Sequence, residues 1–195
     1  MSVIFQGFIF KLLSLFMSVA MLFGVSFDGF KADSSDWNTN YKYVFVHGLS
    51  GWGSYDSVYK LMPYWGMFGG DLMQYLNMKG FDCYAASVAP SSSAWDRACE
   101  LYAQLTGTRV DYGEAHSKAH GHNRYGRTYH KSLCEGFGQR KFHLIGHSHG
   151  GQVIRLLTHL LTYGDKTEQD ATDPADISPL FTGGKEDYIA SVTCI

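Results

Sequence analysis

The sequence has almost no net charge and no run of basic residues. Its 16 lysines and arginines nearly balance 18 aspartates and glutamates, which gives a net charge of -2 at pH 7. Proteins that bind nucleic acids carry a basic face, often with aromatic side chains interleaved, that holds the phosphate backbone. This chain has no such stripe, so the sequence predicts no nucleic-acid partner.

Cysteine is scarce, and its spacing matches no known motif. The four cysteines, Cys83, Cys99, Cys134 and Cys194, form no C-x-x-C pair. This argues against a structural zinc knuckle or a thioredoxin-like redox motif. We therefore expect buried free thiols, which behave as small apolar side chains.

Charge is nearly absent from residues 3–27, where Lys11 alone interrupts an apolar stretch. The uninterrupted part, residues 12–25, has the length of a secretory h-region and is short for a membrane span. Small residues at Gly24 and Ser26 have the spacing of a cleavage site after Ser26.

These features predict a signal peptide over residues 1–26, and an uncleaved signal-anchor is the alternative. Nothing in residues 28–195 resembles a second membrane span. We therefore expect a secreted, extracellular protein that keeps no stable transmembrane domain after cleavage. Residues 27–40 are rich in Asp, Ser and Asn and form a polar leader, and the folded domain is expected over residues 41–195.

The pattern in residues 41–195 predicts an α/β fold with a mostly parallel sheet and helices on both faces. Short apolar runs, which indicate buried strands, alternate with segments of helical periodicity. Residues 55–68 are aromatic and fit either a loop over a site or ordinary packing on the core. Residues 107–139 have no clear period and are long for a loop, so they carry function or a small structure of their own. The predicted strands span 43–46, 81–88, 141–145 and 188–195, the predicted helices 71–76, 95–105 and 152–163, and an acidic, turn-rich connection 165–176.

A glycine-rich turn, GHSHGG over residues 146–151, lies between a predicted strand and a predicted helix. Strand, tight G-x-S-x-G turn and helix are the context of a nucleophile elbow. The glycines permit a strained backbone, and the amides at a helix N-terminus favour negative charge near the serine. The pattern predicts that Ser148 is a nucleophile, and an ordinary glycine-rich turn is the alternative.

A second motif, His47-Gly48-Leu49, follows the first predicted strand. When a serine attacks a carbonyl, the charge that develops on the oxygen needs amide donors. In the elbow arrangement one donor is the residue after the serine, and the other comes from the loop after an earlier strand. We therefore predict that the backbone amides of Leu49 and His149 form an oxyanion hole, with a simple turn at residues 47–48 as the alternative.

The chain offers no plausible general base for this serine. In this arrangement the acid and the histidine follow the nucleophile, yet only His149 and His159 lie downstream of Ser148. His149 is adjacent in the chain, and His159 lies on the same predicted helix, roughly 16 Å away. Neither reaches the hydroxyl, which leaves upstream histidines such as His47 or His120 as the alternative.

Asp96, His116 and His122 form a second group of chemically active residues, with His120 between the two histidines. Imidazoles and a carboxylate are ligands that suit Zn²⁺, which prefers about four. From spacing alone, clustered surface histidines without a metal are the commoner outcome.

Several stretches together resemble the secreted triacylglycerol lipases of Gram-positive bacteria, of the thermophilic bacillus and staphylococcal type, within the α/β-hydrolase superfamily. The resemblance runs colinearly over residues 43–195. It rests on VFVHGLSGWG (44–53), YWG (64–66), SAWDRACELYAQLTG (93–107), VDYGEAHSKAHGHNRYGRTY (110–129), GHSHGG (146–151) and SPLFTGG (178–184).

The resemblance implies hydrolysis of triacylglycerols and other carboxylic esters through an acyl-enzyme on Ser148, with lipid or ester as substrate at an oil–water interface. It places the oxyanion-hole amides at Leu49 and His149, where the family usually has Phe and Gln or Met. It also implies a zinc-type insert with a structural Zn²⁺ bound by Asp96, His116 and His122, while His120 is not a ligand in that pattern.

The resemblance further implies that this chain corresponds to the N-terminal half of the family's domain. The lid, the fourth zinc ligand, the calcium site and the catalytic Asp and His of the family lie beyond the residues present here, so calcium is expected only in a full-length member. We therefore expect weak activity or none from this chain alone. The alternatives are a catalytically dead hydrolase-like domain that binds lipid or a partner chain, and a different acyl hydrolase such as a peptidase or thioesterase.

Overall fold

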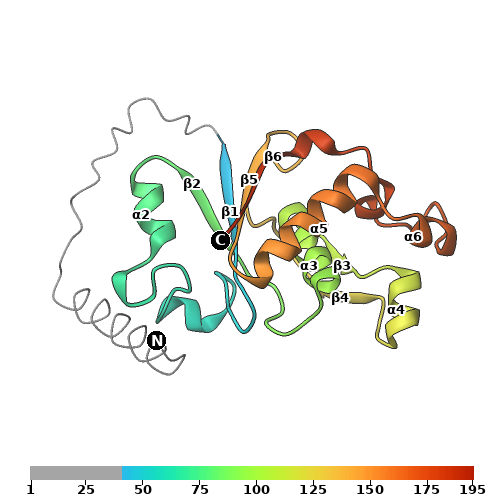
Figure 1. Ribbon diagram of the computed structural model, residues 1–195, viewed down its shortest axis with the longest axis horizontal. Helices are drawn as coiled ribbons and strands as arrows, with labels where there is room; N and C mark the ends of the chain where they lie inside the picture. The colour runs from blue at the N-terminus through green and yellow to red at the C-terminus, as the bar shows by residue number, and fades with distance from the viewer. Residues whose placement is uncertain (1–40) are drawn as a thin grey trace, which may run out of the picture.

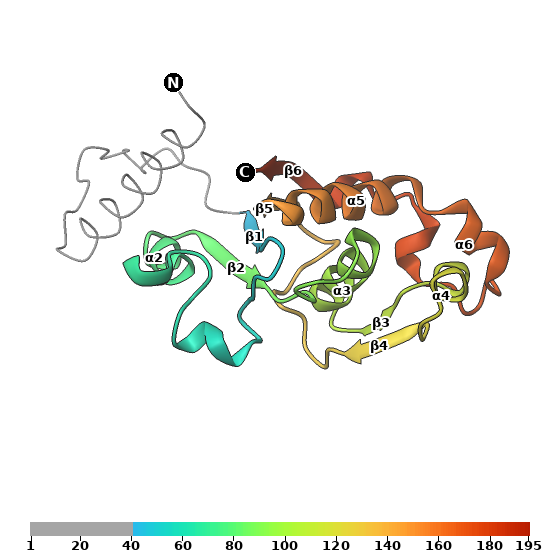
Figure 2. The ribbon, with the colours of Figure 1, turned by 60° about the horizontal axis from the view of Figure 1, so that its bottom comes forward.

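The computed structural model describes residues 41–195 (Figures 1 and 2). The signal peptide or signal-anchor predicted at residues 1–26 and the leader at 27–40 lie outside the described residues. Within residues 41–195, no helix combines the length and the apolar character that a membrane span requires.

A four-stranded sheet in the order β2-β1-β5-β6 forms the centre of the fold. Its strands are β1 (Lys42–Val46), β2 (Asp82–Ala86), β5 (Phe142–Gly146) and β6 (Ile189–Cys194). All three pairings are parallel, and Val44 of β1 lies opposite Tyr84 of β2 and Leu144 of β5. The predicted parallel sheet is confirmed, and the carboxyl ends of its strands meet at one edge.

Helices cover both faces of this sheet, as Figure 1 shows. α3 (Ala94–Thr106) and α5 (His149–Tyr163) pack on one face, and α2 (Leu72–Met78) packs on the other against β2. Two short 3-10 turns, η2 (Ser57–Lys60) and η3 (Met67–Gly69), precede α2. The aromatic stretch at residues 55–68 therefore contains local structure and is not an open loop.

The larger apolar core lies between the sheet and the α3–α5 pair. Val44 and Leu144 point to this face because side chains alternate along a strand, and both are fully buried. They meet side chains that recur at helical spacing on α3 and α5. Those fully or almost fully buried helix residues are Ala98, Leu101, Leu105, Val153, Ile154, Leu157, Leu160 and Leu161.

Residues 107–139 contain a small structure of their own, which was one of the two outcomes expected for this segment. β3 (Arg109–Asp111) and β4 (Tyr125–Thr128) form an antiparallel pair beside α3, and α4 (Glu114–His120) lies between them in the chain. Arg124 closes the unit because its Nε and Nη2 atoms donate to the two carboxylate oxygens of Asp111, at 3.0 and 2.9 Å.

The connection after α5 contains a helix that the sequence pattern does not predict. α6 (Lys166–Ala171) begins where the Asp165 side chain accepts a hydrogen bond from the amide of Glu168, at 2.9 Å. This capping interaction satisfies an amide at the helix start. The turn-rich interpretation of residues 165–176 is therefore wrong for this part. Two 3-10 turns, η4 (Pro179–Thr182) and η5 (Glu186–Tyr188), follow before β6.

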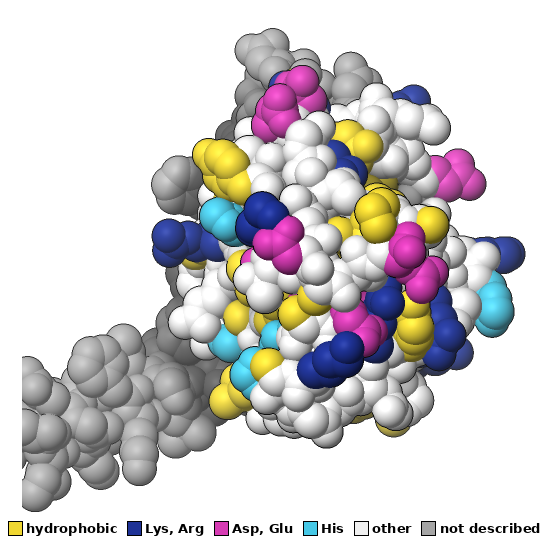
Figure 3. Space-filling model, turned by 90° about the vertical axis from the view of Figure 1, so that its right-hand side faces the viewer, with side chains coloured by type: hydrophobic (Ala, Val, Ile, Leu, Met, Phe, Trp, Pro, Cys, Tyr) yellow, Lys and Arg dark blue, Asp and Glu magenta, His cyan; other side chains and the backbone are white. Residues whose placement is uncertain are grey.

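α6 packs against α4, at the end of the molecule that lies to the right in Figure 1. On the face that Figure 3 presents, acidic, basic and histidine side chains are interspersed. This face carries no large area of a single sign of charge.

β6 and Cys194 differ from the sequence-based expectation. The sequence predicts a buried strand at residues 188–195, but every residue of β6 is exposed or only partly buried. β6 is the outermost strand and pairs only with β5, so the described chain covers little of it. Cys194 is accordingly exposed, whereas the other three cysteines are buried free thiols as predicted, and burial raises the pKa of Cys83 and Cys134 to about 12.

Candidate functional site

Ser148 has a backbone conformation that residues other than glycine rarely adopt. It lies between the end of β5 at Gly146 and the start of α5 at His149, with φ 52° and ψ −122°. Strain of this kind costs on the order of 1–3 kcal/mol and clusters at functional sites. The side chain of Ser148 is exposed. The strand, turn and helix predicted around Ser148 are all present.

Glycines allow this turn to approach the end of β1. A β-carbon added to Gly150 would lie 2.2 Å from the carbonyl oxygen of Val46, and one on Gly146 would lie 2.5 Å from the carbonyl carbon of Gly150. The amide of His147 donates to the same Val46 carbonyl at 3.0 Å. The serine turn is therefore fixed at the carboxyl end of β1, where the next loop begins.

That next segment, residues 47–53, is called the 47–53 loop below, and it contacts the serine directly. A β-carbon added to Gly48 would lie 3.0 Å from the β-carbon of Ser148, and one on Gly53 would lie 2.1 Å from the carbonyl oxygen of Ala86. The loop therefore passes between the serine turn and the end of β2. At the two points of closest approach, Gly48 and Gly53, it has no side chain.

The amides of Leu49 and His149 donate to no protein acceptor within residues 41–195, while their neighbours are occupied. The Gly48 amide donates to the Tyr64 hydroxyl at 3.1 Å, and the Ser50 amide donates to the Pro90 carbonyl at 2.8 Å. The two unpaired amides lie beside the serine, Leu49 in the 47–53 loop and His149 at the start of α5, and their role as oxyanion donors stays a prediction. They are the same two that the sequence predicts.

The side chain of His47 holds the 47–53 loop from the protein interior and is fully buried. Its Nε2 accepts from the Val88 amide at 3.3 Å, so in the neutral ring the proton lies on Nδ1 and is donated to the Gly48 carbonyl at 2.8 Å. Burial lowers the pKa of His47 below its ordinary value. Both nitrogens are engaged in holding backbone, so the structure gives His47 no path to act as a base for Ser148.

Tyr64 connects the 47–53 loop to the serine turn. Its hydroxyl lies 2.6 Å from Nδ1 of His147 and also accepts from the Gly48 amide. One hydroxyl therefore bonds to both segments that flank Ser148, since a phenol oxygen donates once and accepts. The sequence highlights this tyrosine only as part of the aromatic stretch at residues 55–68.

No described histidine pairs with a carboxylate beside Ser148. His149 Nδ1 lies 2.8 Å from Gln152 Oε1, and the His159 ring packs against Tyr163 further along α5. Among residues 41–195, every histidine–carboxylate ion pair involves Asp96, in a different part of the fold. The lack of a general base within these residues stays a prediction from the sequence.

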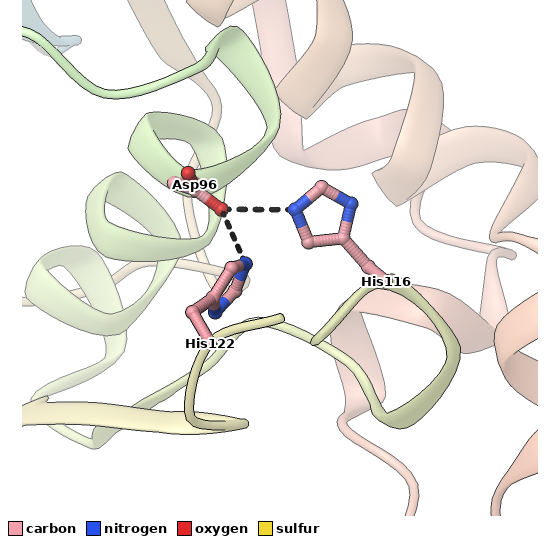
Figure 4. Close-up of side chains that lie close together, drawn as sticks. All are labelled: Asp96, His116 and His122. Atoms are coloured by element: carbon pink, nitrogen blue, oxygen red, sulfur yellow. Dashed lines mark hydrogen bonds and ion pairs between the residues drawn. The ribbon is translucent and has the colours of Figure 1, made fainter. Parts of the chain in front are cut away.

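Asp96, His116 and His122 come together between α3, α4 and the turn after α4 (Figure 4). One ligand atom from each of the three lies within 4.8 Å of the others. Asp96 Oδ1 is 3.0 Å from Nε2 of His116 and 3.8 Å from Nε2 of His122. These separations suit atoms that share one ion, because zinc–nitrogen and zinc–oxygen bonds are about 2.0–2.2 Å long.

Aromatic packing and a buried carboxylate hold His116 in place. The Trp95 ring stacks on the His116 ring at 5.0 Å between centroids. Glu168 of α6 is 1% exposed, and its carboxylate accepts from the amides of Ala115 and His116, at 3.0 and 2.7 Å. Burial lowers the pKa of His116, although its contact with Asp96 acts in the opposite direction. The neutral imidazole that results is the form that binds metals.

The sequence does not predict the supporting roles of three residues, namely Tyr64, Arg97 and Glu168. Arg97 is fully buried on the same helix face as Leu101, Gln104 and Leu105. A charged residue on the apolar face of a predicted helix is an anomaly, and this spacing was the available signal. No sequence signal indicates the role of Glu168, because the pattern does not predict α6.

Comparisons with known proteins point to one family. The family described as "Lipase-like, C-terminal domain" matches residues 39–195. A curated relative, the lipase of Staphylococcus hyicus, is 43% identical over 155 residues, which cover 78% of this chain and 24% of that protein. The chain therefore spans about a quarter of the length of this relative.

Solved structures give the same picture. The structure of EstA from Clostridium botulinum is 46% identical with a TM-score of 0.73, over 83% of this chain and 38% of that one. The crystal structure of Staphylococcus hyicus lipase is 40% identical with a TM-score of 0.72, over 82% of this chain and 42% of that one.

Proposed function

The chain belongs to the lipase-like family, and from that membership we propose that it supplies the nucleophile and the oxyanion hole of a serine ester hydrolase. Its substrates would be triacylglycerols or other carboxylic esters met at an oil–water interface. A different acyl hydrolase is less consistent with relatives that are named lipases.

The observation that carries this proposal is the strained backbone of Ser148 between two unpaired amides. A φ of 52° at a serine is costly, and such strain persists where the site uses it. The amides of Leu49 and His149 are the two flanking donors that lack a protein acceptor within residues 41–195. An ordinary glycine-rich turn explains neither feature.

In the proposed reaction the Ser148 hydroxyl oxygen bonds to the carbonyl carbon of the ester, and its proton passes to a general base. The carbonyl oxygen becomes negatively charged and accepts hydrogen bonds from the amides of Leu49 and His149. The bond to the leaving alcohol then breaks, and the base returns the proton to that alcohol. Water releases the acyl group from the serine by the same steps.

The general base and its acid are proposed to come from the part of the relatives' length that this chain does not span. Within residues 41–195, both ring nitrogens of His47 hold backbone groups, and Nδ1 of His149 lies 2.8 Å from Gln152 Oε1. Without a base the serine is a weak nucleophile, and losses on the order of a million-fold follow such deletions. Residues 41–195 alone are therefore expected to hydrolyse esters very slowly. A catalytically silent domain that binds lipid or a partner chain is the alternative, favoured by this same lack.

We also propose a structural Zn²⁺ held by Asp96, His116 and His122, with a fourth ligand from outside the described chain. The donor set, one carboxylate and two imidazoles within 4.8 Å, fits zinc. The ion would tie α4 to the first turn of α3. Secretion and a calcium site in a longer form remain predictions from the sequence.

A chimera tests the proposal, with this chain replacing the matching segment of the Staphylococcus hyicus lipase. We expect it to hydrolyse short- and long-chain p-nitrophenyl esters, and Ser148→Ala to abolish that hydrolysis. Ser57→Ala is the matched control, because it makes the same change at an exposed serine of η2, outside the serine turn. A folded chimera with no hydrolysis would favour the silent-domain alternative, and hydrolysis that survives Ser148→Ala would contradict the assigned nucleophile.

A further inference from the structure

Arg97, in the first turn of α3, lies directly beneath the 47–53 loop. Its side chain is fully buried, and its Nη2 atom donates to the carbonyl of His47 at 2.6 Å and to the carbonyl of Gly48 at 3.2 Å. Hydrogen bonds from a charged donor are roughly twice as strong as neutral ones. The arginine therefore holds two consecutive carbonyls of this loop toward the protein interior.

The direction of the Gly48 carbonyl fixes the direction of the next amide. A trans peptide is planar, so the C=O of one residue and the N–H of the following residue point in opposite directions. The described chain contains no cis peptide. When the Gly48 carbonyl points inward to Arg97, the N–H of Leu49 must point away from Arg97.

Two further donors converge on the Gly48 carbonyl, namely Nδ1 of His47 at 2.8 Å and the Gly51 amide at 3.3 Å. Arg97 differs from them in two respects. It is charged, and it alone also holds the preceding carbonyl, that of His47, within residues 41–195. Two adjacent peptide planes are thereby fixed by one side chain.

Stability of the described fold does not explain why an arginine is buried here. Within residues 41–195, Nε and Nη1 of Arg97 have no hydrogen-bond partner. The nearby carboxylate of Glu100 attracts the guanidinium electrostatically, but its oxygens accept hydrogen bonds from the Ala89 amide and the Tyr112 hydroxyl and leave Nε and Nη1 unpaired. A buried charge with unsatisfied donors is costly, so its retention points to a role in the site.

We propose that Arg97 is the positioning residue of the oxyanion hole: it turns the Gly48–Leu49 peptide so that the Leu49 amide faces the oxygen of the attacked ester. This inference rests on the proposed function, since it assigns the reason why that amide is aimed at Ser148. The buried guanidinium also adds a fixed positive charge behind the developing oxyanion, in a region of low dielectric.

The test compares Arg97→Met and Arg97→Lys with Gln104→Met in the full chain. Gln104 is the matched control because it is equally buried on the same face of α3, yet it holds the backbone of Ser87 and not the 47–53 loop. The first readout is hydrogen exchange of the Gly48 amide by NMR, since this amide bonds to Tyr64 only when the loop is in place. Thermal unfolding is recorded for every variant.

The second readout is the residual hydrolysis of p-nitrophenyl butyrate, because an oxyanion hole without a base still accelerates hydrolysis roughly 10³- to 10⁴-fold over water. We expect Arg97→Met to lose protection at Gly48 and to lower kcat roughly 10- to 100-fold with KM unchanged, less than removal of a donor itself. Arg97→Lys should recover part of both, and Gln104→Met should change neither.

Unchanged Gly48 exchange in Arg97→Met, or an equal loss of kcat in Gln104→Met, would overturn the inference. So would a loss of protection at Gly48 that leaves kcat unaltered. If the wild-type chain shows no hydrolysis above buffer, the proposed oxyanion hole fails, and the exchange experiment still decides whether Arg97 fixes the loop.

Discussion

A β-carbon added to Gly48 would lie 3.0 Å from the β-carbon of Ser148. The same carbon would lie 3.2 Å from Nδ1 and from the carbonyl oxygen of His147. All three separations are shorter than an ordinary van der Waals contact of a β-carbon. The backbone of the 47–53 loop and the serine turn therefore touch at this point, and any side chain at position 48 must displace one of them.

Gly48→Ala should therefore impair catalysis more than stability. The φ angle of Gly48 is not positive, so alanine fits the backbone, and the effect comes from displacement of the loop. The neighbouring atoms must move by only a few tenths of an ångström. A shift of about 1 Å in a catalytic group costs on the order of 100-fold in rate, so we expect a smaller fall, up to roughly 10-fold, in kcat/KM of the chimera.

Gly69→Ala is the control for this change, because nothing lies within 4 Å of a β-carbon at that position. Ester hydrolysis and thermal unfolding of the two variants are measured together. Equal kcat/KM in the two variants would show that contact between residues 48 and 148 does not matter for the reaction.

Zinc should stabilise the chain through the Asp96 cluster. A ligand at a hundred times its Kd adds about 2.7 kcal/mol to the free energy of unfolding, or roughly 5–10 °C in Tm for a chain of this size. Calorimetry after chelation and stepwise addition of Zn²⁺ measures this shift. His116→Ala should remove it, while His130→Ala, an exposed histidine outside the cluster, should keep it. A Tm that does not change when Zn²⁺ is added, or a zinc-dependent rise in Tm that persists in His116→Ala, would rule out this site.

The stability of the fold should fall as the pH decreases, in part because of His47. Burial lowers the pKa of His47 below 6.5, so the folded state binds this proton less readily than the unfolded chain. Its contribution to stability is therefore complete above pH 6.5 and is lost as the pH falls toward the folded-state pKa, by up to about 1.4 kcal/mol per pH unit.

His47→Gln isolates this contribution, because an amide can still accept from the Val88 amide and donate to the Gly48 carbonyl. Burial also lowers the pKa of His116 and His143, so the variant should retain part of the pH dependence. Urea unfolding between pH 7.5 and 5.5 gives the two slopes. A slope in His47→Gln equal to that of the wild type would contradict the role assigned to the buried His47 ring.

Periodicity and turn motifs were enough to predict the sheet and the serine turn. β1, β2 and β5 are short apolar runs that end at a turn, and Ser148 lies between a strand and a helix as G-x-S-x-G requires. α5 begins at His149, three residues before the predicted start, because the two glycines that follow His149 mask the helical pattern.

Polar contacts between residues far apart in the chain could not be predicted from the sequence. Arg97 touches His47 only after α3 has packed against the sheet, and Glu168 reaches the amide of His116 from a helix that begins at a single capping residue, Asp165. β6 has the composition of a buried strand, yet its position at the edge of the described sheet leaves it exposed.

Covalent labelling of the chimera with a fluorophosphonate, followed by peptide mass spectrometry, identifies the serine that acts as the nucleophile. The reagent bonds to a serine that has a base and an oxyanion hole, and its phosphonyl oxygen occupies the position of the oxyanion. We expect one adduct, on Ser148, that disappears in Ser148→Ala and forms more slowly in Gly48→Ala. An adduct on another residue of this chain, or none on Ser148 in a chimera that hydrolyses esters, would contradict this expectation.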